Sequence, residues 1–384
     1  MRSVGVEEEL LLVDSRSGAP LAVSAAVLAA ARRTAWQQPG GRSDEELSNF
    51  EEELQKEQLE FATKPVTEMG ELQDEISRSR AEAAHYARAG GAVVAALATS
   101  PLPVRPSLNV DSRYEWLAEQ FGLTTQEQLT CGCHVHVSVE SDEEGVAVLD
   151  RIRPWLAVLT AMSANSPFWQ GEDSGYGSYR SRVWNRWPSA GPVDVFGSAD
   201  RYHEQVRAMV DTGVLRDEGM IYFDARLAAA YPTVEIRVAD VCLDPTTPVL
   251  LAALIRGLVE TAARAWQAGE PPARISTGML RLASWRAGRS GLDGPLLHPE
   301  TMQEVAAPHA VEVLYQHVRE ALEDHGDDER VRESIARLHE HGNGARTQRQ
   351  LLSTEGSLAR VVTRCAQLTT EGQTAAPGTS EHMG

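Results

Sequence analysis

The segment Pro232–Asp240 reads Pro-Thr-Val-Glu-Ile-Arg-Val-Ala-Asp and decides the fold that we expect. Its valines and isoleucine alternate with threonine, glutamate and arginine, which is the pattern of a β-strand with one apolar and one charged face. Glu235 and Arg237 therefore share a face. The apolar face predicts helices packed behind the strand. The charged face fits either a solvated salt bridge or part of a functional site.

Two other segments place pairs of ionisable side chains on one face of a strand in the same way. Glu7 and Glu9 lie two residues apart in one such segment, and His134 and His136 in another. Carboxylates opposed across neighbouring strands repel each other and destabilise a sheet. If the three strands share one concave surface, the acidic side chains need compensating cations, and divalent metal ions on oxygen ligands supply them. The pattern therefore predicts a metal site.

The composition describes a large acidic globular protein. The chain has 384 residues, of which 42% are hydrophobic and 24% charged, with a formal net charge of −19 and a pI near 5.0. This charge argues against nucleic acid as a main partner. Its four cysteines are too few for a disulfide scaffold. Because we see neither a secretory leader nor a long apolar run, we expect a cytoplasmic protein without membrane spans.

One acidic segment has two interpretations. Glu53, Glu57 and Glu60 are spaced to share one face of a helix. Residues 56–63 instead alternate polar and apolar side chains and end before Pro65, which indicates a strand. We favour the strand, although an acidic solvated face explains the same spacing.

Cys131, Cys133, His134 and His136 follow one another closely enough to suggest a zinc site. An extended strand rises about 3.3 Å per residue, so these positions span roughly 17 Å. All ligands of one Zn²⁺ lie about 2.0–2.3 Å from the ion. Since one strand cannot wrap around one tetrahedral ion, the geometry argues against zinc here.

Residues 165–197 are rich in aromatic side chains, glycine and arginine, and predict a long loop. A loop of this length inside a compact domain is uncommon and often functional, so we expect either a lid over an anionic ligand or an irregular surface loop. Elsewhere the apolar periodicity predicts antiparallel strands at residues 221–225 and 232–241. It also predicts helices at residues 143–163 (with a kink at Pro154), 249–268, 299–323, 329–341 and 347–368.

In this order along the chain, the motifs resemble the glutamate–cysteine ligase type 2 family, and most closely its bacterial carboxylate–amine ligases. The resemblance covers about residues 3–370 and rests on the ordered set, because each motif alone is weak. The matching motifs are Gly5-Val6-Glu7-Glu8-Glu9, then Glu53 with Gln58-Leu59-Glu60 and Thr63, Gly132-Cys133-His134-Val135-His136, Asn165-Ser166-Pro167, the stretch from Gly175 to Pro192, and Thr233-Val234-Glu235-Ile236-Arg237.

The resemblance implies an α+β, glutamine-synthetase-like catalytic fold. In that fold a curved, mostly antiparallel sheet carries helices on its convex face and the active site on its concave face. We expect a single carboxylate–amine ligase catalytic domain over residues 1–369. A small polar tail at residues 370–384 follows it, and we expect this tail to be disordered.

The resemblance further implies ATP and Mg²⁺ (or Mn²⁺) as cofactors and gives roles to individual residues. The implied metal ligands are Glu7, Glu9, Glu53, Glu60, His134 and Glu235. The implied catalytic residues are Glu235, Arg237 and Arg182, with Arg237 against the transferred phosphoryl group. The implied cofactor-binding residues are Arg180, Arg182, Arg237 and His136, and either Arg180 or Arg182 would bind a substrate carboxylate or a phosphate.

The implied reaction joins a carboxylate to an amine through an acyl phosphate, by default L-glutamate to L-cysteine. Three alternatives stay open: the same chemistry on another amine, a phosphagen-kinase-like phosphotransferase, and a metal- or nucleotide-binding protein without activity. The expected partners are small amino-acid or amine substrates. The oligomeric state stays open, with a homodimer as one candidate. One departure is Ser100, where relatives tend to have histidine in a Gly-Thr-His-Pro motif.

Overall fold

A seven-stranded antiparallel sheet forms the centre of the computed structural model, which describes residues 1–37 and 50–371. Six strands follow the order β2-β3-β1-β5-β9-β8, and β4 pairs with the second half of β1. The strands are β1 (Val4–Asp14), β2 (Phe50–Glu51), β3 (Gln58–Ala62), β4 (Ala92–Ala95), β5 (Gly132–Ser138), β8 (Ala225–Leu227) and β9 (Thr233–Asp240). The strand that the sequence favoured over residues 56–63 is confirmed as β3.

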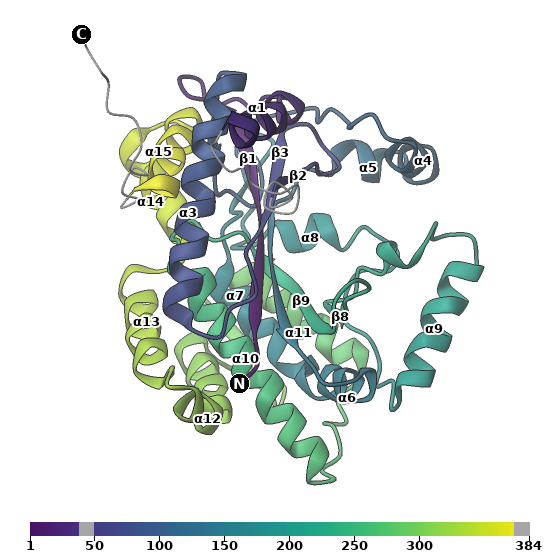
Figure 1. The fold of residues 1–384 in the computed structure, drawn as a ribbon. Helices are drawn as coiled ribbons and strands as arrows, with labels where there is room; N and C mark the ends of the chain where they lie inside the picture. The colour runs from purple at the N-terminus through teal and green to yellow at the C-terminus, as the bar shows by residue number, and fades with distance from the viewer. Residues whose placement is uncertain (38–49, 372–384) are drawn as a thin grey trace.

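Helices lie on both sides of this sheet (Figure 1). On one side stand α3 (Met69–Ala87), α12 (Ala307–His325) and α13 (Asp328–His341), whereas α4 (Ser112–Phe121), α5 (Leu123–Glu127), α8 (Arg180–Trp184) and α9 (Ala199–Asp211) stand on the other. The remaining helices are α1 (Ser24–Gln37), α6 (Asp142–Ile152), α7 (Leu156–Ser163), α10 (Thr247–Gln267), α11 (Thr277–Ser290), α14 (Gly344–Glu355) and α15 (Leu358–Thr370). Over the described ranges, no helix combines the length and the apolar character needed to cross a bilayer.

The apolar face of β9 packs against helices, as its alternation predicted. Val234 and Ile236 are buried in one hydrophobic cluster with Leu250 and Leu254 of α10. The alternation then breaks, because the pairing of β5 with β9 shifts register between Cys133 and Val135. A bulge of this kind changes which way the following side chains point. Val238, which the sequence placed on the apolar face, is consequently only half-buried.

Proline and glycine interrupt two of the helices that the sequence predicted, and the interruption at Pro154 confirms the kink expected there. The helix expected over residues 143–163 is interrupted by a 3-10 turn at Arg153–Trp155, because Pro154 has no N–H to continue the α-helical ladder. The helix expected over residues 347–368 is two helices, α14 and α15, which separate at Gly356. That residue has a φ of 72°, a left-handed conformation that glycine adopts without strain.

Pairing between short strands moves two further boundaries. The helix expected to start at residue 299 begins at residue 307, because β10 (Pro295–Leu297) and β11 (Glu304–Ala306) form a hairpin before it. The strand expected at residues 221–225 is β8, which begins only at Ala225. The expected tail, residues 370–384, lies outside the described residues except for its first two positions, and Thr370 still belongs to α15.

The segment 165–197 is built into the core and is not a free lid. It contains the hairpin of β6 (Phe168–Trp169) and β7 (Glu172–Asp173), followed by α8. The backbone N–H groups of Gly177 and Ser178 both donate to the carbonyl of Gly288 in α11, at 2.9 Å each. Its aromatic side chains supply apolar area, and Phe168 and Trp187 are buried. The segment is therefore packed against the rest of the protein beside the sheet.

A buried ion pair fixes β1 from behind. The side chains of Glu8 and Arg80 are both 0% exposed. Arg80 donates from Nε to Glu8 Oε2 at 2.8 Å and from Nη2 to Oε1 at 2.7 Å, and it also donates to the carbonyls of Cys242 and Leu243. The pair therefore ties β1 to α3 and to the chain that leaves β9. Alternation along β1 then directs Glu7 and Glu9 to the opposite face of the sheet.

The substitution Arg80→Met is expected to lower the free energy of unfolding by about 3–5 kcal/mol, because it leaves the Glu8 carboxylate buried without a partner. Urea denaturation measures this loss. The double variant Glu8→Leu with Arg80→Met should recover most of it, since an apolar pair leaves no uncompensated charge. A loss below about 1 kcal/mol in the single variant would contradict the role of this pair.

Candidate active site

Strand register brings the predicted ionisable residues together in rows across the sheet. In one row Glu9 of β1 stands opposite Glu60 of β3, which stands opposite Glu51 of β2. In the next row Glu7 of β1 stands opposite His134 of β5. Register thus brings Glu9 beside Glu60 and Glu7 beside His134, and it adds Glu51, which no sequence pattern pointed to.

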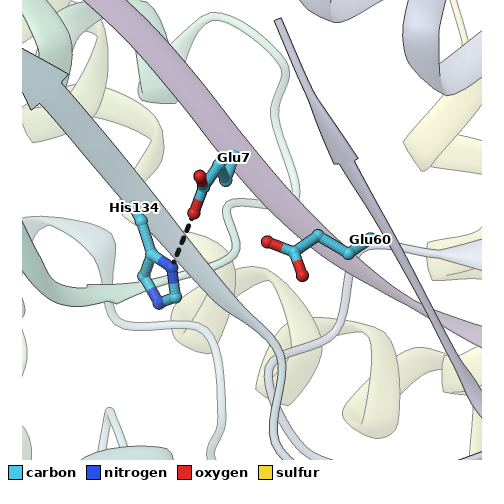
Figure 2. Close-up of side chains that lie close together, drawn as sticks. All are labelled: Glu7, Glu60 and His134. Carbon is cyan, nitrogen blue, oxygen red and sulfur yellow. Dashed lines mark hydrogen bonds and ion pairs between the residues drawn. The ribbon is translucent and has the colours of Figure 1, made fainter. Parts of the chain in front are cut away.

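Glu7, Glu60 and His134 form one group that could hold a metal ion. Their possible ligand atoms all lie within 4.8 Å of one another. The Oε2 atom of Glu7 lies 3.3 Å from Nδ1 of His134, and the carboxylate of Glu60 points toward the same space from β3 (Figure 2). Three different strands thus contribute to one small group of oxygen and nitrogen ligands.

A second group of possible ligand atoms shares Glu7 with the first and adds His136 and Glu235. The Oε1 atom of Glu7 lies 3.2 Å from Nε2 of His136, which stands opposite Glu235 in the pairing of β5 with β9. Arg226 of β8 donates from Nε to Glu235 Oε2 at 2.6 Å, and Arg237 also pairs with Glu235. The Glu235 carboxylate is therefore held between two guanidinium groups.

The acidic row holds carboxylates that resist ionisation. Burial, and then the charge of Glu53, raise the pKa of Glu9 to about 8. The same two causes hold the pKa of Glu60 well above its ordinary value. The backbone N–H of Gly132 donates to Glu9 Oε2 at 2.7 Å, but this one hydrogen bond does not offset the repulsion. The charges of Arg180 and Arg237 also lower the pKa of Glu9, but they offset only part of the effect of burial and repulsion, so the protein alone compensates this row incompletely.

The second group behaves in the opposite way. Burial alone would raise the pKa of Glu235, but the charges of Arg237 and then Arg226 outweigh it and lower the pKa to about 2. Burial also opposes ionisation of Glu7, yet hydrogen bonds from His134 and His136 hold its pKa well below the ordinary value. These two carboxylates therefore carry their charge across the physiological pH range.

His134 offers a free imidazole nitrogen for a metal ion. Burial, and then the charge of Arg237, lower the pKa of His134 to about 4, so its ring is neutral at pH 7. With its proton on Nδ1 toward Glu7, the ring leaves a lone pair on Nε2. That atom is buried and, over the residues that the structure describes, has no hydrogen-bond partner. Imidazole and carboxylate ligands together suit a divalent cation, so the residues present fit such an ion.

The acidic residues open into a cavity of about 250 Å³ between the sheet and the helices α4 and α8. Glu7, Glu9, Glu53, Glu60, His134 and Arg237, all predicted from the sequence, line this cavity. Gln58 and Trp187, which belong to two of the matching motifs, also line it. Its other walls carry residues that no motif pointed to, among them Arg113, Tyr114, Gln128, Tyr222 and Arg226. Glu235 and His136 adjoin it through Glu7.

Arg180 lies behind the acidic row, where Gly132 makes room for it. The Arg180 side chain is buried, and one of its terminal nitrogens stands 2.3 Å from the place that a Cβ on residue 132 would occupy. The glycine of the Gly-Cys-His-Val-His motif is therefore required by close approach. From this place the charge of Arg180 acts on Glu9, and its guanidinium lies over the ring of Trp184.

Arg182 does not line the cavity of the carboxylate cluster. Residues two apart on a helix point about 200° away from each other, so α8 cannot direct both Arg180 and Arg182 to one site. Arg182 lines a separate cavity of about 330 Å³ together with Arg186 and Arg281. The structure thus places the two arginines in different surroundings.

Arg226 is a site residue that no sequence pattern pointed to. It stands opposite Glu235 in the pairing of β8 with β9, between Ala225 and Leu227. The short alternation of this strand was a usable signal, but the strand was expected four residues earlier. The structure also shows the surroundings of the cysteines and of Ser100. Cys131 and Cys133 pack into different hydrophobic clusters, and buried Ser100 donates to the carbonyl of Leu102.

Residues 3–364 match the model of glutamate–cysteine ligase family 2. Two relatives, from Streptomyces avermitilis and Streptomyces coelicolor, are each 60% identical to the chain over 369 residues, which cover 96% of this chain and 99% of each relative. The names of both relatives assign them provisionally as glutamate–cysteine ligase 2.

Solved structures share the fold at much lower identity. A bifunctional glutathione synthetase from Pasteurella multocida superposes with a TM-score of 0.70 at 16% identity, over 96% of this chain and 52% of its own. A glutamate–cysteine ligase from Francisella tularensis, in complex with AMP, superposes with a TM-score of 0.67 at 12% identity, over 96% of this chain and 89% of its own. The expected ligase-type α+β fold is therefore confirmed, and the chain belongs to glutamate–cysteine ligase family 2.

Proposed function

We propose that the chain is an ATP-dependent carboxylate–amine ligase that works with Mg²⁺ or Mn²⁺. One observation carries this proposal. In a member of this family, two groups of metal-capable ligand atoms share Glu7 and lie beside the guanidinium of Arg237, in a cavity that a small substrate can enter. Most of the acidic residues that the family resemblance implies therefore lie in one place.

The chemical problem in such a reaction is to bring anions together. A carboxylate oxygen attacks the γ-phosphorus of ATP, ADP leaves, and an acyl phosphate forms. The amine then attacks the acyl carbon, inorganic phosphate leaves, and the nitrogen loses a proton. Both steps depend on the protein positioning and neutralising negative groups. The nucleotide assignment is supported by the AMP bound to the Francisella tularensis relative.

The residues of the carboxylate cluster would have different roles in this reaction. Glu7, Glu9, Glu53, Glu60, His134 and Glu235 would hold the divalent ions, which when bound neutralise charge on phosphate oxygens. Arg237 borders the cavity and would face the transferred phosphoryl group. His136 stands beside Glu7 and would help to orient it toward the nucleotide. Arg226 keeps Glu235 ionised and in place.

Within this class we infer that L-glutamate and L-cysteine are the default substrates, which makes γ-glutamylcysteine the product. The provisional names of the Streptomyces relatives support this choice. The cavity of Arg182, Arg186 and Arg281 offers cationic groups for the carboxylates of a small substrate. ATP and free amino acids occur together in the cytoplasm, where we place the reaction.

The experiment that tests the proposal measures phosphate release from ATP and Mg²⁺ with glutamate, with and without cysteine, and identifies the products by mass spectrometry. A product with the mass of γ-glutamylcysteine that requires both amino acids supports the full proposal. ADP formed only with another amine keeps the ligase and replaces cysteine. Phosphorylation of a guanidine without an amide product, or no nucleotide turnover with any pair of substrates, overturns the proposal.

Glu235→Gln is expected to lower kcat by roughly 10²–10³-fold, because a preorganised charge beside the reacting phosphate is lost. Phosphate release measures this, and thermal unfolding shows that the variant folds. Glu144→Gln is the matched control, since Glu144 is also 3% exposed and also pairs with an arginine, Arg2, outside the cavity. Equal losses of kcat in the two variants would show that Glu235 has no special role.

Divalent-ion affinity is expected to depend on pH through Glu9. Because the pKa of Glu9 is about 8 without metal, its carboxylate is protonated below that pH and must lose a proton to bind a cation. The Mn²⁺ dissociation constant, measured by titration calorimetry, should fall by up to about tenfold per unit between pH 6 and pH 8 and then level off.

Glu9→Gln should reduce this dependence, because the amide mimics the protonated acid at every pH, and the dependence that remains belongs to Glu60, whose pKa is also raised. The exposed Glu143→Gln on α6 serves as a control that should leave the pH profile unchanged. A wild-type dissociation constant that stays constant from pH 6 to pH 8 would contradict the placement of Glu9 among the metal ligands.

A further inference from the structure

Asp240, the last residue of β9, accepts several hydrogen bonds from the segment 165–184. It is 0% exposed. Its Oδ2 atom accepts from the backbone N–H of Asn165 at 2.8 Å and from the Ser166 hydroxyl at 2.7 Å, and its Oδ1 atom accepts from the Ser178 hydroxyl at 2.8 Å. Three donors from two separated parts of the segment 165–184 therefore meet on one carboxylate.

The same two serines fix the start of α8. The Ser166 hydroxyl oxygen accepts from the backbone N–H of Arg180 at 3.0 Å, and the Ser178 hydroxyl oxygen accepts from the backbone N–H of Ser181 at 3.3 Å. Each serine thus donates to Asp240 and accepts from α8. The carboxylate is consequently one hydrogen bond away from the backbone that carries the Arg180 side chain.

Charge links Asp240 to Arg180 as well. Arg180 is 2% exposed, and its guanidinium donates to the carbonyl of Arg237 at 3.5 Å. Among the described residues no carboxylate lies within ion-pair distance of it. Asp240 stands opposite Gly132 in the pairing of β5 with β9, and the missing side chain of Gly132 leaves the space that Arg180 fills. A buried cation without an ion-pair partner is costly. The Asp240 carboxylate is fully buried and close enough that the charge of Arg180 acts on it.

We propose that Asp240 is a positioning residue that holds Arg180 behind the carboxylate cluster through Ser166 and Ser178. The inference rests on the proposed function only for its catalytic consequence, which is that Arg180 supplies positive charge beside Glu9 during the reaction. Asp240 itself does not line the cavity that holds the cluster. It acts through Arg180.

A ligand-free measurement tests the structural part. Trp184 lies close to two guanidinium groups, with the Cζ atoms of Arg180 and Arg237 each 5.6 Å from the centre of a Trp184 ring. The ¹⁹F resonance of Trp184 in protein labelled with 5-fluorotryptophan, assigned with Trp184→Phe, therefore reports where these cations lie. Asp240→Asn and Ser166→Ala are both expected to shift this resonance.

Asp150→Asn is the matched control for this measurement. Asp150 is also a buried carboxylate, and it accepts from the backbone N–H groups of Phe196 and Gly197 at 2.8 Å each, at a different place in the fold. It should leave the Trp184 resonance unmoved. Identical Trp184 spectra for wild type and folded Ser166→Ala and Asp240→Asn would overturn the inference, and Ser166→Ala still decides it if Asp240→Asn fails to fold.

A double-mutant cycle tests the catalytic part. Asp240→Asn alone is expected to lower kcat/KM by about 10- to 100-fold, as loss of a group that orients a site residue does. In an Arg180→Gln background the same change should have less than about a twofold effect, because the residue that it positions is already gone. Fully additive effects would overturn the inference.

The two arms keep this inference separate from the proposed function. If the wild-type protein shows no ligase turnover, the proposed function fails, whereas the Trp184 resonance still decides whether Asp240 positions Arg180. If turnover is normal and the Trp184 resonance does not respond to either variant, the ligase assignment stands and the positioning role is wrong.

Discussion

The site depends on the antiparallel register of β1 with its two neighbours. Hydrogen bonds to β3 place Glu9 opposite Glu60, and hydrogen bonds to β5 place Glu7 opposite His134. Side chains that are directly opposed across strands have Cβ atoms about 4.5–5.5 Å apart. The carboxylates cannot separate without breaking the backbone ladder, so the sheet maintains a repulsion that an added cation relieves.

The two faces of β1 treat negative charge differently. On the buried face Glu8 is fully compensated by Arg80, and every part of that pair is closed to ligands. On the other face the pKa values of Glu9 and Glu60 are raised, because burial and the charge of Glu53 oppose their ionisation more strongly than the nearby arginines favour it. The buried pair of Glu8 and Arg80 holds β1 in place. The row of Glu9 and Glu60 faces the cavity, where a bound cation can compensate its charge.

Local backbone geometry determines where the arginines lie around the carboxylate cluster. The short helix α8 sends Arg180 toward Gly132 and Arg182 into a separate cavity with Arg186 and Arg281. Arg237 follows Glu235 on β9, just where the register shifts, and pairs with that carboxylate. Positive charge is thereby placed both inside the carboxylate cavity and next to it, which is the arrangement that a reaction between two anions requires.

The sequence by itself determined the strands that carry the site and the identity of most acidic residues in it. Alternation with a period of two states which side chains share a face, so the pairs Glu7 with Glu9, His134 with His136 and Glu235 with Arg237 could be read directly. The long apolar helix α10 followed from its periodicity in the same way. The family followed from the order of these motifs along the chain.

Only the tertiary structure decided which of these residues meet. Register, a bulge and the space beside a glycine are contacts between segments far apart in the chain, and a pattern within one segment carries no information about them. Four features of the site arise in this way. They are the row of Glu9, Glu60 and Glu51, the ion pair of Arg226 with Glu235, the separate cavity of Arg182, and the hydrogen bonds that connect Asp240 through Ser166 to Arg180. Local periodicity fixes direction, whereas long-range hydrogen bonding and packing fix position.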